Sequence, residues 1–433
     1  MPHYWRFNKV QEPPIRASLG CVGENTSRVT VVGLNYWPEP TGIAPYTSGF
    51  AAGMAEAGFD VRAITAFPHY PAWAISKDYS GRTVTEVLSG VHVKRVRPFM
   101  PSKLNGLSRL FMEIRFGVRA VFSKWGKPDV VVLVSPALFA TAVVLIRARL
   151  SVKRPSIVIW VQDLYSLGVT ETGAMGALGG RLMALFESVV LNRADLVVAI
   201  HNRFKRYISS ALSVPEENVA VVRNWTHLSP ISVDRLDYRT KFGWGAETVV
   251  LHAGNMGAKQ ALENVVEAAR LADIDESPVR FVLVGNGNQR DALVANAVGA
   301  VRIEFLDSLN GEDFQGAMAA ADILLVNEKP GVSEMAVPSK LTSYFSASRP
   351  VIAATDAGSI TAEEIDVSNA GVRADAGDPR ALLDAVLDLR RNPERAEQYG
   401  QCGAEFQRRV LSSHSAISQY AEIINSLAGK RGR

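Results

Sequence analysis

Residues 28–66 read RVTVVGLNYWPEPTGIAPYTSGFAAGMAEAGFDVRAITA, and this stretch decides the fold. A β-branched run at 28–34 leads into a loop rich in Pro and Gly. A helical pattern follows over 46–57, and a second strand pattern covers 59–66. Strand, loop, helix and strand at this spacing form a βαβ unit with parallel strands. The segment therefore predicts an α/β fold.

The same alternation continues on both sides of a turn-rich stretch at residues 226–245. Further strand patterns lie at 129–134, 156–161 and 194–200, and then at 248–253, 279–284, 301–305, 322–326 and 350–354. Two such series predict two doubly wound, Rossmann-like domains, at residues 28–228 and 229–413, facing each other across a cleft. No strand follows the last helical pattern, so we expect residues 414–433 to form a helix that crosses back and a short tail.

Composition limits the class of protein. The 433 residues are 47% hydrophobic and 21% charged, which is typical of an ordinary globular protein large enough for two domains. Two cysteines exclude a disulfide scaffold and a Cys/His zinc site, and favour a reducing cytoplasm. Residues 1–27 lack the apolar core of a signal peptide, so we expect a disordered extension.

Charge is distributed unevenly. Residues 1–228 carry 26 Lys and Arg against 15 Asp and Glu, a net charge of +11, whereas residues 229–433 carry a net charge of −7. We expect the basic half to face an anionic partner. Residues 130–146 form the most apolar stretch, and Pro136 within it favours a buried strand and helix over a membrane span.

A basic amphipathic pattern covers residues 103–127, with six Lys and Arg beside the single acid Glu113. Such a helix is typical of membrane-surface binding, which would make Arg109, Arg115 and Arg119 face an anionic membrane. An ordinary core-facing helix with a solvated basic face remains the alternative.

Ligands of doubly wound sheets bind beyond the carboxyl ends of the strands, so the loops there are the candidate sites. The loop at 35–45 lacks the GxGxxG pattern of a dinucleotide site, but Gly42, just before a helix, can approach an anion or a sugar. In the second half, GNMGAKQ at 254–260 combines Gly254, Asn255 and Gly257 with Lys259 ahead of a helix. This pattern indicates a diphosphate site that needs no metal, and a solvated lysine in a tight turn is the alternative.

Two more loops repeat this chemistry at later strand ends. Gly285 and Asn286 in GNG offer backbone to a nucleoside, and VPSKL at 337–341 brings Ser339 and Lys340 to the same edge. Glu334 is placed to accept hydrogen bonds from ribose hydroxyls.

His69 and Asp163 follow strands of the first half and are candidates for acid–base chemistry. The alternatives are a structural hydrogen bond for His69 and a helix or turn cap for Asp163. The only D-x-D follows a helix, and HExxH, GxSxG and Walker patterns are absent, so no metal site is expected.

The quoted motifs, taken together, resemble those of the family 4 retaining glycosyltransferases, which have the GT-B fold. The resemblance covers residues 28–427 and rests on NYWPEPTG, FPHYP, WVQDL, VRNW, GNMGAKQ, LVGNG and VPSKL. It is strongest to the branch that makes exopolysaccharide, capsule and O-antigen, such as the colanic-acid transferases.

The resemblance implies transfer of a hexosyl group from a nucleotide-diphosphate sugar to a lipid-linked or saccharide acceptor, with no metal, cofactor or nucleic-acid partner. Lys259 would bind the diphosphate, Asn255 stands where an arginine is common, Gly42 would approach the transferred sugar, and Gly285 the nucleoside. The expected location is the cytoplasmic face of the plasma membrane, with peripheral attachment.

One departure concerns a glutamate pair that many members carry near the VPSKL loop. Its second position is Ser343, and its first falls near Met335, one residue from Glu334. Two alternatives stay open: a nucleotide-sugar epimerase on the same fold, and a non-catalytic binding module, which the missing glutamate pair favours. The +11 half argues against the epimerase, and the intact Lys259 loop argues against the binding module.

Overall fold

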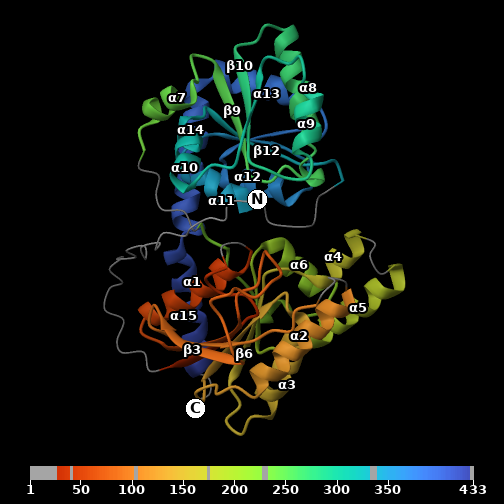
Figure 1. Cartoon of the computed structure of the whole chain (residues 1–433), viewed down its shortest axis with the longest axis vertical. Helices are drawn as coiled ribbons and strands as arrows, with labels where there is room; N and C mark the ends of the chain where they lie inside the picture. The colour runs from red at the N-terminus through yellow and green to blue at the C-terminus, as the bar shows by residue number, and fades with distance from the viewer. Residues whose placement is uncertain are drawn as a thin grey trace.

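The computed structural model describes residues 27–39, 42–101, 106–172, 176–226, 233–331 and 339–429. In these ranges the chain forms two α/β bodies stacked along the long axis, called here the first half (27–226) and the second half (233–412) (Figure 1). The expected extension at 1–27 falls almost entirely outside the described residues, as does the expected boundary at 228/229.

The sheet of the first half has the order β3-β4-β2-β1-β5-β6-β7-β8, and all of its pairs are parallel except β3 with β4. Its strands are β1 Arg28–Val32, β2 Asp60–Ala66, β3 Thr83–Leu88, β4 Val91–Val96, β5 Val130–Ser135, β6 Ser156–Val161, β7 Leu196–Ala199 and β8 Val219–Val221. Its helices are α1 Ala44–Glu56, α2 Gly106–Val121, α3 Leu138–Leu150, α4 Tyr165–Thr172, α5 Gly176–Leu191 and α6 Asn202–Ser210. Every residue of β5 and β6 is buried, as expected for parallel strands covered on both faces.

The sheet of the second half is entirely parallel and has the order β11-β10-β9-β12-β13-β14. Its strands are β9 Thr248–Ala253, β10 Val279–Val284, β11 Ile303–Leu306, β12 Ile323–Asn327, β13 Val351–Ala354 and β14 Gly371–Ala374. Its helices are α7 Arg235–Phe242, α8 Glu263–Ile274, α9 Arg290–Asn296, α10 Gly311–Ala320, α11 Ser339–Ser346, α12 Ile360–Ser368, α13 Pro379–Arg391 and α14 Pro393–Val410. The prediction of two doubly wound units is confirmed.

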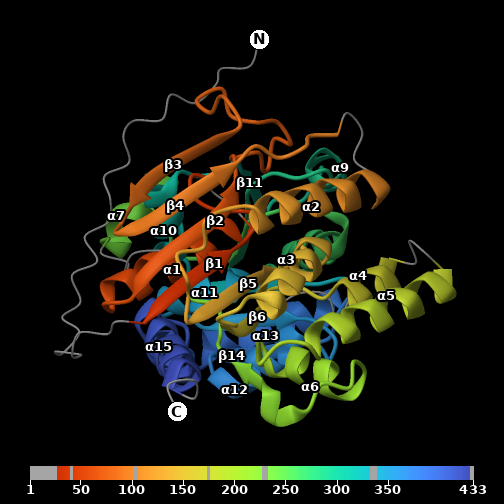
Figure 2. The same ribbon diagram turned by 90° about the horizontal axis from the view of Figure 1, so that it is seen from below.

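The C-terminal helix α15, Ser413–Gly429, returns to the first half, as expected (Figures 1 and 2). The Tyr420 ring lies 4.8 Å from the Phe50 ring of α1 and 5.3 Å from the Trp160 ring of β6, centroid to centroid. Such edge-to-face contacts add to the free energy of burying the rings. Aromatic packing therefore fixes the end of the chain on the first half.

The sequence analysis missed several described elements, among them the β3–β4 hairpin, β8, β14 and α7. The hairpin turns at Ser89 and Gly90, which both have positive φ angles, as a two-residue hairpin turn requires. Helix α7 lies in the stretch expected to be turn-rich. It begins where the Asp234 side chain accepts hydrogen bonds from two backbone N–H groups and ends at the left-handed Gly243.

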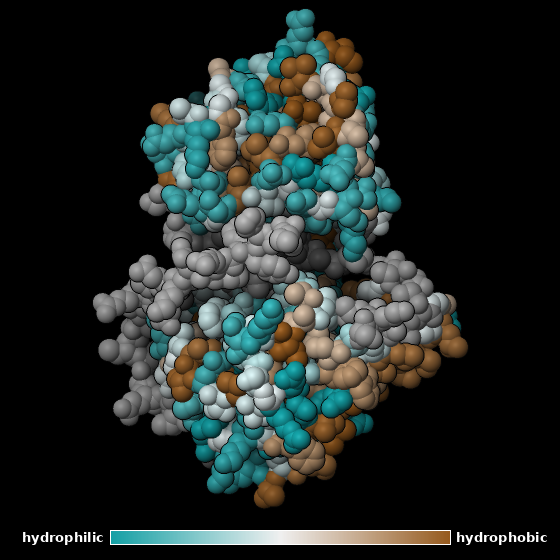
Figure 3. Space-filling view, viewed as in Figure 1, coloured by the Kyte–Doolittle hydropathy of each residue, from teal (hydrophilic) through white to brown (hydrophobic). Residues whose placement is uncertain are grey.

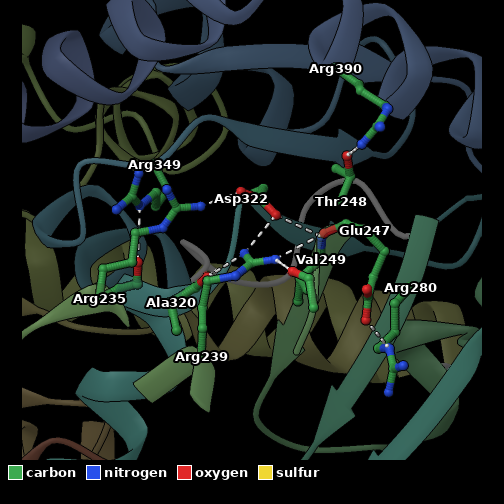
Figure 4. A network of polar contacts seen from close by, with 12 residues as sticks. Arg235, Arg239, Glu247, Thr248, Val249, Arg280, Ala320, Asp322, Arg349 and Arg390 are labelled. Atoms are coloured by element: carbon green, nitrogen blue, oxygen red, sulfur yellow. Dashed lines mark hydrogen bonds and ion pairs between the residues drawn. The ribbon is translucent and has the colours of Figure 1, made fainter. Parts of the chain in front are cut away.

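A polar network joins α7 to the end of the second sheet opposite the loops discussed below (Figure 4). The Asp322 carboxylate accepts hydrogen bonds from Arg235, from Arg239 at 3.0 Å and from the backbone N–H of Val249 at 2.8 Å. Because these partners come from α7 and β9, the chain belongs to the second half from residue 234 onward.

The apolar stretch at 130–146 forms β5 followed by α3, as expected. None of the helices within the described ranges is long and apolar enough to cross a membrane.

Candidate functional site

The loops at the carboxyl ends of β9 and β10 are joined backbone to backbone. Gly254 N–H donates to the Val284 carbonyl at 2.8 Å, and Met256 N–H donates to the Asn286 carbonyl at 2.9 Å. Gly285 has φ +133°, and a Cβ atom there would lie 2.0 Å from the Gly254 carbonyl oxygen. Only glycine fits at that position, which leaves a surface of bare backbone. The side chains of Asn255 and Asn286 are exposed beside it.

Lys259 stands at the rim of this surface, on a single 3₁₀ turn at Ala258–Gln260. Its carbonyl accepts the Lys329 N–H at 2.8 Å, and Gly257 N–H donates to the Gln260 side chain at 3.1 Å. These bonds hold the turn, while the Lys259 side chain is exposed. Burial raises the pKa of Asp163 in the first half, and the Lys259 charge opposes that rise, so the ammonium acts electrostatically on this carboxyl group.

Lys340, in the first turn of α11, approaches the same loop from the other side. A Cβ atom at Gly254 would lie 2.7 Å from the Lys340 Cε atom. The Lys340 ammonium donates to His252 Nε2 at 3.0 Å, while His252 Nδ1–H donates to the Leu325 carbonyl at 3.2 Å. Burial lowers the pKa of Lys340 to about 8, and burial together with the neighbouring ammonium keeps His252 neutral by lowering its pKa. Two lysines therefore flank the Gly254 loop.

His252 was missed by the sequence analysis. A histidine inside the apolar run TVVLHA was the available signal, because a buried polar group requires a partner. Ser339 begins α11, but its side chain lies outside the described part of the structure, as does Glu334. Ser343 lies on α11, whereas Met335 is outside the described ranges.

Asp163 follows β6 in the first half and is exposed to solvent. Its carboxylate accepts the Leu164 N–H at 2.9 Å, as the expected cap would. The loss of water to the surrounding protein raises the pKa of Asp163, and the charges of Arg109 and Lys259 oppose that rise. Next to it, the Gln162 and Asn224 amides exchange hydrogen bonds at 2.8 and 3.2 Å, which brings WVQDL and VRNW together.

Two buried carboxylates lie behind Asp163. Glu113 accepts hydrogen bonds from the Tyr165 hydroxyl and from the Phe139 N–H at 3.2 Å, and Glu187 accepts from the Tyr165 N–H at 2.9 Å and from Ser166. Burial raises the pKa of both carboxyl groups. They hold the start of α4, and with it the Asp163 backbone.

His69 is buried beneath the loop that follows β1. Its Nδ1 atom lies 2.9 Å from the Phe67 carbonyl and 3.2 Å from Glu39 Oε1. Glu39, which the sequence analysis missed, also accepts the backbone N–H groups of His69 at 2.8 Å and Tyr70 at 3.0 Å. Gly42, at φ +69°, packs beside the Tyr70 ring. The imidazole thus has structural partners, while a catalytic role for it remains a prediction.

A polar junction joins the two halves. Glu364 of α12 accepts hydrogen bonds from His201 Nε2 at 2.8 Å and from Arg223. Burial opposes ionisation of Glu364, but these two partners outweigh it and lower its pKa. Arg206 and Glu363 add an exposed ion pair at 2.9 Å. The two halves are therefore in direct contact.

The three arginines expected to face a membrane are placed differently from one another. The Arg109 guanidinium lies 3.4 Å from buried Glu113 and 5.5 Å from the Tyr165 ring centroid, and its charge acts on Asp163. Arg115 lies over the rings of Phe99 and Phe111, and Arg119 donates to the Arg97 carbonyl at 2.8 Å. Membrane contact by any of them remains a prediction.

Among the described residues, no three His, Cys, Asp or Glu side chains gather into a group that could hold a metal ion.

Two models of known protein families match this chain, one in each half. The family model for a glycosyl transferase 4-like domain matches residues 41–225, and that for glycosyl transferases group 1 matches residues 247–392. The putative colanic acid biosynthesis glycosyl transferase WcaI of Escherichia coli (strain K12) is 31% identical over 337 residues, which are 73% of this chain and 81% of WcaI.

Solved structures of similar fold span nearly the whole chain. Sucrose-phosphate synthase from Thermosynechococcus elongatus superposes with a TM-score of 0.69 at 15% identity, covering 93% of this chain and 100% of that one. HepE of Anabaena in complex with UDP-glucose superposes with a TM-score of 0.64 at 15% identity, covering 92% and 99%.

Proposed function

This chain belongs to the family 4 glycosyltransferases of the GT-B fold, and from that premise we propose that it transfers a hexosyl group, with retention, from a nucleotide-diphosphate sugar to a lipid-linked or saccharide acceptor. The proposed role is cell-surface polysaccharide synthesis, because WcaI is named for colanic acid biosynthesis. The reaction is proposed to need no metal.

One observation carries the proposal: Lys259 and Lys340 flank the bare backbone of the Gly254 loop, and the Lys259 charge acts on Asp163 of the first half. Two ammonium groups beside glycine backbone that no side chain covers suit a diphosphate. A donor held there by Gly254, Asn255, Gly257, Gly285 and Asn286 would present its sugar to the first half. The complex of HepE with UDP-glucose shows that a protein of this fold binds such a donor.

Lys259 would neutralise the charge that develops on the departing diphosphate, a form of transition-state stabilisation. Asp163 would accept a hydrogen bond from the acceptor hydroxyl and take its proton, since the carboxyl is exposed at the junction. Gly42 and His69 would approach the transferred sugar from the β1 side. Ser339 and Glu334 are proposed as further donor contacts.

We assign the acceptor to the basic first half, and propose peripheral attachment to the cytoplasmic face of the plasma membrane. Arg115 and Arg119, on α2, carry that part of the proposal, because Arg109 pairs with Glu113 and Tyr165. A lipid-linked acceptor would be met at that surface.

Thermal shift with a panel of nucleotide sugars, followed by release of free sugar without acceptor, tests the reaction. A donor at 100 times its dissociation constant stabilises the fold by about 2.7 kcal/mol. We expect one donor to stabilise the protein. The protein should hydrolyse that donor slowly and release a sugar with retained anomeric configuration. EDTA should not change the rate of hydrolysis. Interconversion of sugar isomers on the intact donor would identify an epimerase, and binding without any turnover in the presence of cell-envelope acceptors would identify a binding module.

The role of Asp163 is tested separately. Asp163→Asn keeps the hydrogen bond to the Leu164 N–H through its amide oxygen but cannot take a proton. Loss of a positioned acid–base group typically costs about 100-fold or more in rate. We expect transfer to fall by that factor with donor binding unchanged; transfer at the wild-type rate would leave Asp163 as a turn cap only.

A further inference from the structure

Helix α5 exposes a stripe of apolar side chains that nothing in the described structure covers. Leu178, Leu182, Leu185 and Val189 follow one another at steps of four, three and four residues, so they share one helix face. Their exposed fractions lie between 44% and 72%. The opposite side of the helix is packed through Gly180, Val190 and Leu191. Large side chains aligned and exposed in this way mark a contact surface.

The neighbouring helices extend the stripe. Helix α3 packs against both α2 and α5, and the three helices lie side by side on one side of the first half (Figure 2). Apolar residues gather along that side of the molecule (Figure 3). We define the three-helix face by its exposed apolar residues, which are Leu107, Phe111, Ile114, Val118, Phe122, Ile146, Leu150, Leu178, Leu182, Leu185 and Val189.

The charges on these helices are of one sign at the surface. Helices α2, α3 and α5 contain two carboxylates within the described ranges, Glu113 and Glu187, and each is only 1% exposed. Both are turned inward, where they accept hydrogen bonds from Tyr165 and Ser166. The exposed charges of the three helices are therefore arginines, among them Arg115, Arg119 and Arg181.

Exposed apolar side chains together with exposed arginines indicate one kind of partner. Surfaces that bind other proteins surround an apolar centre with a polar, solvent-accessible rim. An apolar face with only cationic groups matches an anionic bilayer, where leucines enter the acyl boundary and arginines meet the phosphates.

We propose that the three-helix face docks flat on an anionic phospholipid bilayer, with the α5 stripe inserted beside the α2 segment. The inference rests on the proposed membrane attachment and adds α5 as its apolar anchor. Helix α4, which precedes α5, begins two residues after Asp163. Docking through α5 would therefore bring Asp163 near the membrane surface, from which a lipid-linked acceptor would reach it.

Sedimentation of the full chain with vesicles tests this. The vesicles contain phosphatidylglycerol and phosphatidylcholine, or phosphatidylcholine alone, at low salt. We expect wild type to sediment with the anionic vesicles only, and L178S/L182S/L185S to lose at least about tenfold in partitioning, because each buried CH₂ contributes to membrane affinity. The matched control is L236S/I274S/V301S, which removes equally exposed residues of the second half and is expected to bind like wild type.

Two further measurements separate the possible outcomes. Leu182→Trp reports insertion directly through quenching by brominated lipid, and donor hydrolysis reports the active fold. If the α5 variant binds as wild type while R115E/R119E does not, attachment through α2 stands and the α5 anchor is overturned. If wild type binds no anionic vesicle, both are overturned, although donor turnover still supports the transferase. A wild-type dimer that the α5 variant converts to a monomer would identify the stripe as a self-association surface and overturn the proposal.

Discussion

The loops after β1 and after β9 occupy equivalent places in their two sheets and are built in opposite ways. Each follows a central strand that has parallel neighbours on both sides. The β9 loop is held by backbone bonds through Gly254 and Gly285, and its Lys259 side chain projects outward. The β1 loop is held by a buried side chain, Glu39, which His69 and Tyr70 surround.

The difference between the two loops shows which side chains remain available to bind a ligand. The β9 loop is stabilised by its own backbone, so its Lys259 side chain stays available to a ligand. The β1 loop uses the Glu39 carboxylate for its own structure, so that side chain is not available. Changes in the β9 loop should therefore cost turnover, and changes at the core of the β1 loop should cost stability. Four variants or conditions test this contrast, from the largest expected effect to the smallest.

Lys259→Ala should reduce kcat by about 100- to 1,000-fold, as removal of one electrostatic group from a transition state typically does. The thermal midpoint should not change, because the side chain is exposed. Steady-state kinetics with Lys329→Ala, an exposed lysine nearby, as the control measures this. Full kcat in Lys259→Ala would remove the lysine from the mechanism.

Glu39→Ala should lower the free energy of unfolding by about 3 kcal/mol, because it leaves the buried N–H group of His69 and the half-buried N–H group of Tyr70 without their acceptor. Differential scanning fluorimetry of the variant beside Glu56→Ala, an exposed carboxylate on α1, measures the difference. An unchanged midpoint together with a large loss of kcat would show that Glu39 acts on substrate, and would break the contrast.

Gly285→Ala should weaken donor binding and lower stability by about 1–3 kcal/mol, since the backbone is at a positive φ angle that alanine rarely adopts. Isothermal titration with the donor checks the binding. Gly299 also has a positive φ angle, but no atom lies near its Cβ position. Gly299→Ala is therefore the control that measures backbone strain without loss of a loop contact. Equal effects in both variants would reject a specific role for the Gly254–Gly285 contact.

Donor affinity should weaken by up to about tenfold as pH rises from 7 to 9. The pKa of Lys340 is lowered to about 8, so its ammonium is present below that pH and is lost above it. A bound diphosphate would favour the charged form, and binding above pH 8 should therefore take up a proton. Titrations in two buffers of different ionisation enthalpy measure that uptake. A Lys340→Met protein with the same pH profile would assign the effect to another group.

Much of the fold could be predicted from sequence because its signals are local. β-branched runs, helical spacing and glycines at strand ends are properties of segments shorter than about 20 residues, and both doubly wound units follow from them. The same signals located Gly254, Gly285 and Lys259. The β3–β4 hairpin also had a local signal, the Ser89-Gly90 turn between two β-rich runs, and the sequence analysis missed it.

Other features depend on pairs that only the fold brings together. His252 meets Lys340 across 88 residues, and His201 meets Glu364 across 163. The inward turn of Glu113 onto Tyr165 directs Arg109 toward Asp163, although the helical pattern of α2 predicts only an amphipathic helix. No periodicity within a segment encodes such contacts, because they depend on strand order and on how helices pack over the sheet.

The sequence by itself therefore determined the two parallel sheets through their central strands, and the glycine loops at the strand ends, since each depends on neighbours along the chain. The tertiary structure alone decided which charges act on each other: Lys259 on Asp163, Glu39 beside His69, and the arginines of α2, α3 and α5 on a face whose two carboxylates are buried. The physical reason is that a charge acts through space over several ångströms, whatever its separation along the chain.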